Sequence, residues 1–380
     1  MGTAYTPGLT VSHDHGVLKK RRLPIAGEVL VDVGQAVEYS DVVARAELSG
    51  DIETIRLADR MQLDPDELEG KLIVEVGEEV KKGQLLAESP GIFGFFKSEV
   101  RSSVEGTVEY FTAATGHLGI RKPPIHIEVK AYVSGQVVEL EEAQGVTVRT
   151  RGALIQGIFG VGGERHGEIQ VVADSPDSLL KVSELSGDLQ GKILVGGAHV
   201  DLEGLRAAAD AGVVGIVVGG VHDSDLAEFL GYDIGVAITG DEDIPLTLIL
   251  TEGFGQIHMA NRTFELLKSL DGSFASFNGA TQIRAGAMRP EIIVPHSNQE
   301  KRDAGPDTPA DAAKGHALAI GTTVRAVRQP HFGEIGTVTE LPSEPVRVAS
   351  GAVVRILKMK MENDLEVALP RANVEIIEDD

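Results

Sequence analysis

Two stretches of the chain repeat one pattern of apolar and polar residues. Residues 27–37 (GEVLVDVGQAV) line up with residues 70–80 (GKLIVEVGEEV), and residues 43–44 then line up with residues 86–87. Alternation with a period of two places the apolar side chains on one face of a strand. The central glycine of each copy suits a tight turn between short strands. The pattern therefore predicts several copies of one small β-unit.

The segments around the repeat complete a β-rich region. Residues 55–68, between the two copies, predict a short helix. Further glycine-centred strands are expected at 104–108 and 133–137, because both segments resume the same alternation. We therefore expect a flexible tail over residues 1–22, followed by a β-domain over residues 23–151 that carries the helix as an insert.

Three segments of this region resemble a known fold family. They are residues 27–44 (GEVLVDVGQAVEYSDVVA), residues 70–87 (GKLIVEVGEEVKKGQLLA) and residues 100–111 (VRSSVEGTVEYF), and they are similar to the half-motifs of the lipoyl/biotinyl barrel-sandwich hybrid fold. That fold occurs in carrier proteins, in the C subunit of the Rnf complex and in insertions of RNA polymerase. The resemblance implies an all-β barrel-sandwich hybrid over about a third of the chain.

The pattern changes over residues 152–294. Continuous apolar runs, typical of buried strands, alternate with segments of helical periodicity, and this alternation predicts a central α/β domain with parallel strands. Residues 191–218 resemble swivelling and protease-associated β/α domains. We expect strands at 192–195, 213–218, 235–238 and 246–250, and helices at 202–211, 223–230 and 256–270.

The C-terminal part follows a polar, proline-bearing segment, residues 295–316, which we interpret as a linker. Residues 321–342 (GTTVRAVRQPHFGEIGTVTELP) and 367–377 (VALPRANVEII) are similar to a KOW motif and its small SH3-like barrel. The resemblance implies a KOW-type SH3-like β-barrel over residues 317–380. The predicted fold is thus multi-domain α/β, with all-β domains at both ends.

The overall composition excludes several classes of function. The formal net charge of −23 repels phosphate backbones and anionic membranes, and aromatic residues make up only 4% of the chain, which disfavours a stacking surface for single-stranded nucleic acid. The absence of cysteine excludes disulfides, thiolate metal sites and a cysteine nucleophile. Without a long apolar run or a signal-like start, we expect a soluble, cytoplasmic protein that does not enter a membrane.

Two lysines could be confused with the attachment sites of carrier domains. Lys97 lies near the expected hairpin tip but lacks the residues that flank a carrier lysine. Lys360 lies in Met-Lys-Met, which resembles a biotinylation tip, yet too few residues follow it for a second half-motif. We interpret Lys360 as the outward side of a strand, with its methionine neighbours inward, and we expect no cofactor.

Two glycine-rich segments are candidates for ligand binding in the central domain. Residues 157–167 could form an anion nest from consecutive amides, and residues 219–223 follow a buried strand and open a helix, where ligands often bind in open α/β sheets. A tight structural turn is the competing interpretation of both. The candidate ligand residues are Gly160, Gly162, Gly163, Glu164, Arg165, His166, Gly219, Gly220 and His222.

Two short polar runs near the N-terminus are weaker candidates for a binding site. His13 and His15 could share one face of a strand and bind a metal, but no further ligand is evident, and we expect no metal. Residues 19–22 (KKRR) could bind an acidic partner or nucleic acid, or could simply be solvated. No pattern of a catalytic nucleophile elbow or of a metalloprotease helix occurs.

These observations favour a non-catalytic binding, scaffold or assembly protein with a protein partner and without a modifiable carrier lysine. One alternative is an enzyme or anion-binding protein that uses the glycine segments of the central domain. Another is a transcription- or ribosome-associated KOW factor, with nucleic acid bound only through the C-terminal barrel. The candidate partner-binding residues are Phe93, Phe95, Phe96, Arg325, Arg328 and Phe332.

Overall fold

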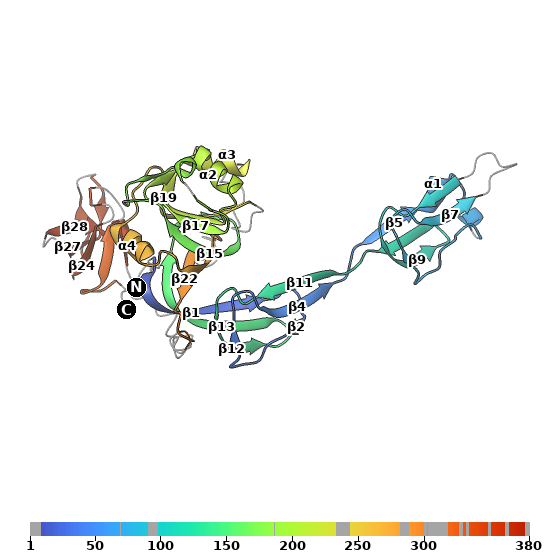
Figure 1. Ribbon diagram of the computed structural model, residues 1–380, viewed down its shortest axis with the longest axis horizontal. Helices are drawn as coiled ribbons and strands as arrows, with labels where there is room; N and C mark the ends of the chain where they lie inside the picture. The colour runs from blue at the N-terminus through green and yellow to red at the C-terminus, as the bar shows by residue number, and fades with distance from the viewer. Residues whose placement is uncertain are drawn as a thin grey trace.

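The chain folds as an elongated, largely β, multi-domain protein in the computed structural model (Figure 1). Strands account for 48% of the structure, and the described residues form four short α-helices, so the mostly β character is confirmed. The structure describes residues 9–68, 70–89, 98–185, 187–232, 244–281, 289–299, 302, 318–326, 330–331, 334–348, 351–361 and 365–376.

One end of the molecule is a small unit that we call the distal β-module, residues 52–121 (Figure 1). Thirteen buried residues, with Ile55, Leu86 and Leu118 fully buried among them, give it a core of its own. Its elements are β5 (Ile52–Arg56), α1 (Leu57–Met61), the 3₁₀ helix η1 (Pro65–Leu68), β6 (Glu79–Val80), β7 (Leu85–Ser89), β8 (Ser98–Arg101), β9 (Gly106–Thr112) and β10 (His117–Arg121).

A second unit, the inner β-module, connects the distal β-module to the rest of the chain. Its core contains Val37, Val43, Tyr132 and Val137. It comprises β2 (Glu28–Val29), β3 (Ala36–Val37), β4 (Val42–Leu48), β11 (Ile125–Lys130), β12 (Gly135–Glu141) and the start of β13 (Gly145–Gln156). β4 and β11 pair antiparallel, and the whole distal β-module is inserted between them.

The sequence repeat is present, but its copies belong to different modules. The amide of Gly34 donates to the carbonyl of Val137 over 2.8 Å in the inner β-module, and the amide of Gly77 donates to the carbonyl of Val108 over 2.8 Å in the distal one. The expected single domain over residues 23–151 is therefore two modules. Its helical insert is the α1 and η1 portion of the distal module, and residues 55–56 belong to strand β5 instead.

The expected N-terminal tail is wrong for the residues that the structure describes. β1 (Val11–Arg22) runs antiparallel along β13, with a register from Val11↔Ile155 to Arg22↔Gly145. Val11 and Val17 are buried, so this segment contributes to the core as well as to the sheet. Its charged side chains occupy the exposed or paired positions of an otherwise ordinary strand.

The central part is built on the largest sheet, and parallel strands form its middle as expected. Antiparallel strands flank them. Its strands are, in spatial order, β14 (Phe159–Val161), β20 (Thr247–Phe254), β19 (Gly215–Val221), β17 (Lys192–Val195), β15 (Glu164–Val171), β21 (Phe274–Asn278), β22 (Glu291–Pro295), β13, β12 and β3, with β16 (Leu179–Leu180) and β18 (His199–Val200) off this path.

Helices cover both faces of this sheet, because neighbouring side chains of β19 point to opposite sides. Ile216 packs in one cluster with α2 (Leu202–Asp210) and α3 (Asp223–Leu230), and the 3₁₀ helix η2 (Val182–Glu184) joins them. Val217 packs on the other side with α4 (Asn261–Ser269).

The predicted limits of the central helices were partly right. Asp201 caps α2 as expected, since its side chain accepts the amide of Gly204 over 2.8 Å. The helix expected from residue 256 begins only at Asn261, and α3 is preceded by His222 as its cap residue and not by Asp223. The strand expected at 235–238 lies outside the described residues.

The C-terminal β-unit packs beside α4 (Figure 1). Leu357 and Met359 of its strand β27 are buried while Lys360 is exposed, so the predicted orientation of this strand is confirmed. Its elements are β23 (Thr323–Ala326), β24 (Ile335–Glu340), β25 (Val346–Arg347), β26 (Val353–Val354), β27 (Ile356–Met361), β28 (Glu366–Pro370), η3 (Arg371–Asn373) and β29 (Val374–Ile376). Among the helices of the described part, none is long and apolar enough to span a membrane.

Candidate functional site

The first glycine-rich segment forms strands instead of an open loop. Gly160 lies in β14 and is buried, and its amide donates to the hydroxyl of Thr281 over 2.9 Å. Only Gly162 and Gly163 remain as a turn before β15, and Gly162 has the positive φ of +86° that glycine tolerates. Residues 157–167 therefore do not present the run of consecutive free amides that an anion nest requires.

The second glycine-rich segment is also part of the sheet. Gly219 and Gly220 lie in β19, and their amides donate to the carbonyls of Gly197 and Ala198, each over 2.8 Å. A Cβ at Gly219 would lie 2.1 Å from the carbonyl oxygen of Ile257, so glycine is required here for close packing. His222 packs its ring against His199, with centroids 4.7 Å apart.

The charged residues that follow the first segment have internal partners. Glu164 accepts two hydrogen bonds from Arg21, over 2.5 and 2.7 Å, and Arg165 donates to the carbonyl of Ile244. His166 lies with Nε2 2.8 Å from the carbonyl oxygen of Tyr132. Of the predicted ligand residues, only His166 comes close to the cleft described below.

The basic run of β1 is neutralised within the molecule. Lys19 pairs with Glu291 over 2.5 Å, and Lys20 and Arg22 both approach Glu141. Together with the pair between Arg21 and Glu164, every cation of the run has an acidic neighbour. The solvated or structural interpretation of residues 19–22 is therefore favoured over a nucleic-acid site.

The histidine pair of the N-terminus does not form a metal site. Asp14 accepts two hydrogen bonds from Arg151, over 2.7 and 3.0 Å, and a third from His296 over 2.8 Å. Hydrogen bonds from Arg151 hold the pKa of Asp14 well below its ordinary value. Within the described ranges no group of three or more potential ligands is arranged for a metal ion.

The predicted partner-binding residues divide into two groups. Arg325 is buried and donates to Glu252 over 3.0 Å, so its guanidinium is not exposed to an external partner, which corrects that prediction. Lys358, another cation of the C-terminal β-unit, pairs with Glu340 over 2.5 Å. The other predicted partner residues lie outside the described residues: Phe93, Phe95, Phe96, Arg328 and Phe332.

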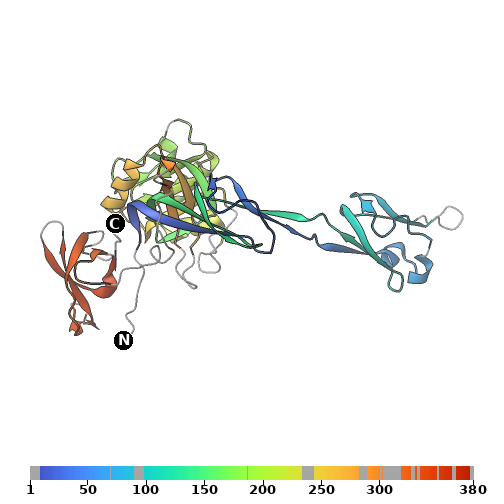
Figure 2. The ribbon, with the colours of Figure 1, turned by 90° about the horizontal axis from the view of Figure 1, so that it is seen from below.

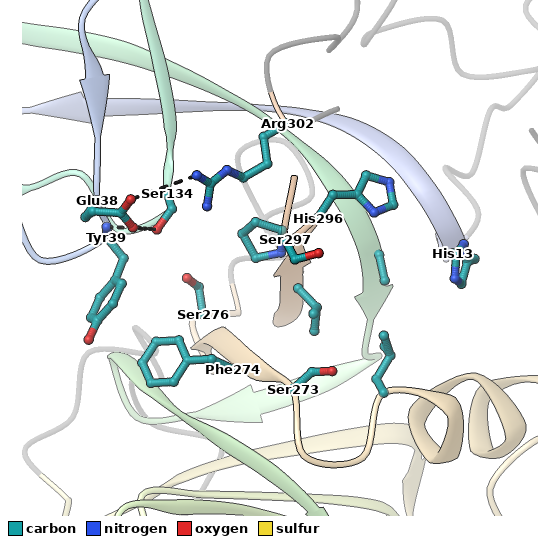
Figure 3. Close-up of a pocket in the computed structure, with 14 residues that line it drawn as sticks. His13, Glu38, Tyr39, Ser134, Ser273, Phe274, Ser276, His296, Ser297 and Arg302 are labelled. Carbon is teal, nitrogen blue, oxygen red and sulfur yellow. Dashed lines mark hydrogen bonds and ion pairs between the residues drawn. The ribbon is translucent and has the colours of Figure 1, made fainter. Parts of the chain in front are cut away.

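A cleft of about 450 Å³ lies where the inner β-module meets the large sheet (Figure 3). The inner β-module contributes Glu38, Tyr39 and Ser134 to its wall, and β21 and the end of β22 contribute four further residues. The remaining lining residues are His13, Ala153, Leu270, Ser273, Phe274, Ser276, Val294, Pro295, His296, Ser297 and Arg302.

One wall of the cleft is aromatic. The ring of Tyr39 contacts the rings of His166 and Phe274, with centroid distances of 4.5 and 4.8 Å, and those two rings stack on each other at 6.4 Å. Ring pairs at such separations attract one another beyond the burial of their area. Phe274 nevertheless keeps 46% of its surface exposed, and its ring faces the cleft in Figure 3.

The backbone of Tyr132 fixes this aromatic wall from behind. Tyr132 has a left-handed φ of +70°, which is costly for a residue with a side chain. Its carbonyl oxygen accepts from the hydroxyl of Ser276 over 2.6 Å and from Nε2 of His166. Burial lowers the pKa of His166, so its imidazole is neutral and carries its proton on Nε2, where the carbonyl requires a donor.

Polar side chains form the opposite part of the cleft. The hydroxyl of Ser134 donates to Glu38 over 2.6 Å, and the guanidinium of Arg302 lies 3.9 Å from the same carboxylate (Figure 3). His296, whose orientation is held by Asp14, and His13 close this side, with ring centroids 6.2 Å apart. The arrangement offers hydrogen-bond donors and a flat apolar wall to a small molecule.

Of these lining residues, the sequence interpretation singled out only His13, and for a metal instead of this cleft. One signal was available, because residues 38–39 are Glu-Tyr in the first copy of the repeat and the equivalent residues 81–82 are Lys-Lys in the second. His296 and Arg302 were assigned to a linker, and nothing in their neighbourhood indicated a site. No protein-family model matches this chain, and no curated protein does either.

Proposed function

We propose that the protein is a non-catalytic assembly protein, which uses the distal β-module to contact a protein partner at a distance from the sheet-based body of the molecule. The observation that carries this proposal is the insertion of a module with a complete core between two strands of another module (Figure 2). The core of this module shares no residue with the two cores of the large sheet, and its position away from the body supports a role in contact with another molecule.

The two chain segments that connect the inner and distal β-modules support a defined position of the distal β-module. β4 and β11 pair up to Leu48↔Ile125, and β5 and β10 resume at Ile52↔Arg121. Between them the amide of Lys122 donates to the carbonyl of Asp51 over 3.0 Å. We call residues 49–51 and 122–124 the neck. Because this backbone hydrogen bond joins them and paired strands continue on both sides, the two segments of the neck are held together and are not independent linkers.

Charge favours a protein partner over nucleic acid. The distal β-module contains eight basic and thirteen acidic residues, a net charge of −5 in a chain of −23. A surface of this sign repels phosphate backbones. The alternative function as an RNA-associated factor required free cations in the C-terminal β-unit, but Arg325 pairs with Glu252 of the large sheet and Lys358 pairs with Glu340.

The repeat supplies candidate contact residues and a matched control. Ile73 and Val76 expose 51% and 61% of their surface on the distal β-module. The equivalent Leu30 and Val33 expose 39% and 59% on the inner β-module. Exposed apolar residues next to a turn are suited to contact with a partner surface.

The proposal is tested by placing a photo-crosslinking amino acid at residue 76 or at residue 33 of the full-length protein in its native cells. We expect one protein to be crosslinked in high yield from residue 76 and not from residue 33. Val76→Asp should abolish co-purification of that protein, and Val33→Asp should leave it unchanged. Crosslinks confined to residue 33, or none from either residue, would rule out the distal β-module as the contact site.

A further inference from the structure

We infer that the cleft between the inner β-module and the large sheet binds a small ligand that combines a planar ring with one anionic group, a carboxylate or a phosphate. This site is independent of the proposed partner contact, because its lining residues belong to the body and the inner β-module. Its volume of about 450 Å³ lies in the range of ligand pockets, about 300–1,000 Å³.

Arg302 provides the charge that recognises the anion. Its side chain is only 17% exposed, and its Nε atom is buried without a hydrogen-bond partner in the part of the chain that the structure describes. Its contact with Glu38, at 3.9 Å, is longer than a hydrogen bond. A guanidinium has five donors in a planar fork that fits the two oxygens of a carboxylate or phosphate, and here these donors face a cleft.

Glu38 can release Arg302 without losing its own partner. The carboxylate of Glu38 accepts from Ser134 over 2.6 Å, and 61% of its side chain is exposed to solvent. A ligand anion that takes over the guanidinium therefore leaves no buried charge unpaired. This differs from a buried structural ion pair, in which separation of the partners leaves an unpaired buried charge.

The other charged groups of the cleft also favour an anion. Asp14 is engaged by Arg151 and by His296, so its negative charge is compensated. Arg151 and Arg302 balance the charges of Asp14 and Glu38. A cationic ligand would find no carboxylate in the cleft that lacks a cationic neighbour.

The aromatic wall provides the place for a planar ring. Tyr39 is held from one side by His166, and Phe274 leaves nearly half of its surface open to the cleft. The hydroxyls of Ser273 and Ser297 and the ring edge of His296 lie on the same cavity and can hydrogen-bond polar atoms of a heterocycle (Figure 3). A ligand whose flat ring stacks on Phe274 and whose anionic group faces Arg302 contacts both the aromatic wall and the guanidinium.

The inference is tested by calorimetric titration of the full-length protein with adenosine monophosphate and with 4-hydroxybenzoate, a phosphate and a carboxylate of this class. Adenosine alone and inorganic phosphate alone separate the contributions of ring and anion. We expect at least one of the two complete ligands to bind at least tenfold more tightly than its parts. Arg302→Gln should weaken it at least tenfold, and Phe274→Ala should weaken adenosine or phenol binding as well.

Arg206→Gln is the matched control, because Arg206 pairs with Glu228 on the surface of α2 and α3. This variant should bind like the unmodified protein, which excludes a general effect of lost charge. Absence of binding by both complete ligands at millimolar concentration, or equal binding by the protein with and without Arg302→Gln, would overturn the inference. Neither result depends on whether a partner is found on the distal β-module.

Discussion

Arg325 of β23 and Glu252 of β20 form a buried ion pair, with Nη1 and Oε1 3.0 Å apart and side-chain exposures of 5% and 1%. The same oxygen of Glu252 accepts the amide of Ala260, the residue before α4. The pair therefore joins the C-terminal β-unit to the large sheet and to α4 at one point. The ion pair also explains why Arg325, which the sequence analysis assigned to a partner-binding surface, is not exposed to a partner.

Removal of one member of this pair should be costly. We expect Arg325→Met to destabilise the protein by about 3–5 kcal/mol, because it leaves the carboxylate of Glu252 buried without its charge partner. Arg325→Met combined with Glu252→Leu should restore most of that loss, apart from the hydrogen bond to Ala260, worth about 1 kcal/mol. Urea denaturation followed by circular dichroism measures both. A single variant as stable as the unmodified protein would show that the pair is not buried in solution.

The neck depends on a glycine. A Cβ at Gly50 would lie 2.1 Å from the carbonyl oxygen of Lys122, and Arg121 donates to the carbonyl of Gly50 over 3.1 Å. We expect Gly50→Ala to separate the two strands at the neck and to broaden the range of orientations of the distal β-module. The core of that module should stay folded, because it lies beyond the neck.

The chain contains no cysteine, so spin labels on cysteines introduced at Lys82 and Arg206 report a single distance by electron paramagnetic resonance. A narrow distribution in the unmodified protein and a broad one in Gly50→Ala are the expected outcome. Asp51→Ala, a change of an exposed neighbouring side chain, is the control and should leave the distribution narrow. Equal widths in all three proteins would mean that the neck tolerates the added methyl group.

The strand pattern predicted which residues are buried but not which strands bury them. Val43 and Leu86 occupy equivalent positions of the repeat, and both are fully buried. Val43 packs with Val137 in the inner β-module, whereas Leu86 packs with Leu118 in the distal one. Alternation fixes only which face of a strand is apolar, and the partner that covers this face comes from elsewhere in the chain. One domain and two modules are therefore equally compatible with the pattern.

The cleft could not be derived from the sequence for a related reason. Tyr39, Ser134, Phe274 and Arg302 are far apart in the chain, and each is unremarkable among its neighbours. They meet because β13 runs through both the inner β-module and the large sheet. Residues 157–167 showed the opposite error, since a glycine-rich segment indicated a binding loop although its glycines serve close packing between strands.

Acidification should destabilise the folded protein through the buried His166. Burial lowers the pKa of His166 in the folded protein below the value of about 6.5 for an unfolded histidine. The unfolded chain therefore binds this proton first, and stability is lost as the pH falls below about 6.5 toward the lowered pKa. We expect the melting temperature to fall between pH 7 and pH 5.5.

His166→Gln should reduce this pH dependence, because the amide of glutamine can donate to Tyr132 but does not titrate. His199→Gln should independently reduce the pH dependence of the melting temperature, since burial and the neighbouring His222 also lower the pKa of His199. The double variant should show the flattest profile when melting temperature is recorded against pH by calorimetry. If His166→Gln keeps the full slope, protonation of His166 does not contribute to acid destabilisation.

Adjacent arginines of β1 should differ in their contribution to stability. Arg21 is 15% exposed, donates twice to Glu164 and once to the carbonyl of Lys130, and lies 5.3 Å above the ring of Tyr132. Arg22 contacts only the carboxylate of Glu141 among the described residues, and 53% of its side chain is in solvent. We expect Arg21→Gln to cost about 1–3 kcal/mol, because bidentate pairs and partly buried charge-assisted bonds are strong.

Arg22→Gln should change stability much less, because exposed pairs are screened and hold two flexible side chains at an entropic cost. Both variants lower the net charge of the basic run by one, so the comparison separates structural pairing from charge alone. Thermal unfolding at low and at moderate salt measures the difference, and the loss from Arg21→Gln should persist at moderate salt. Equal and salt-sensitive losses in the two variants would instead indicate that residues 19–22 act only as a cluster of surface charge.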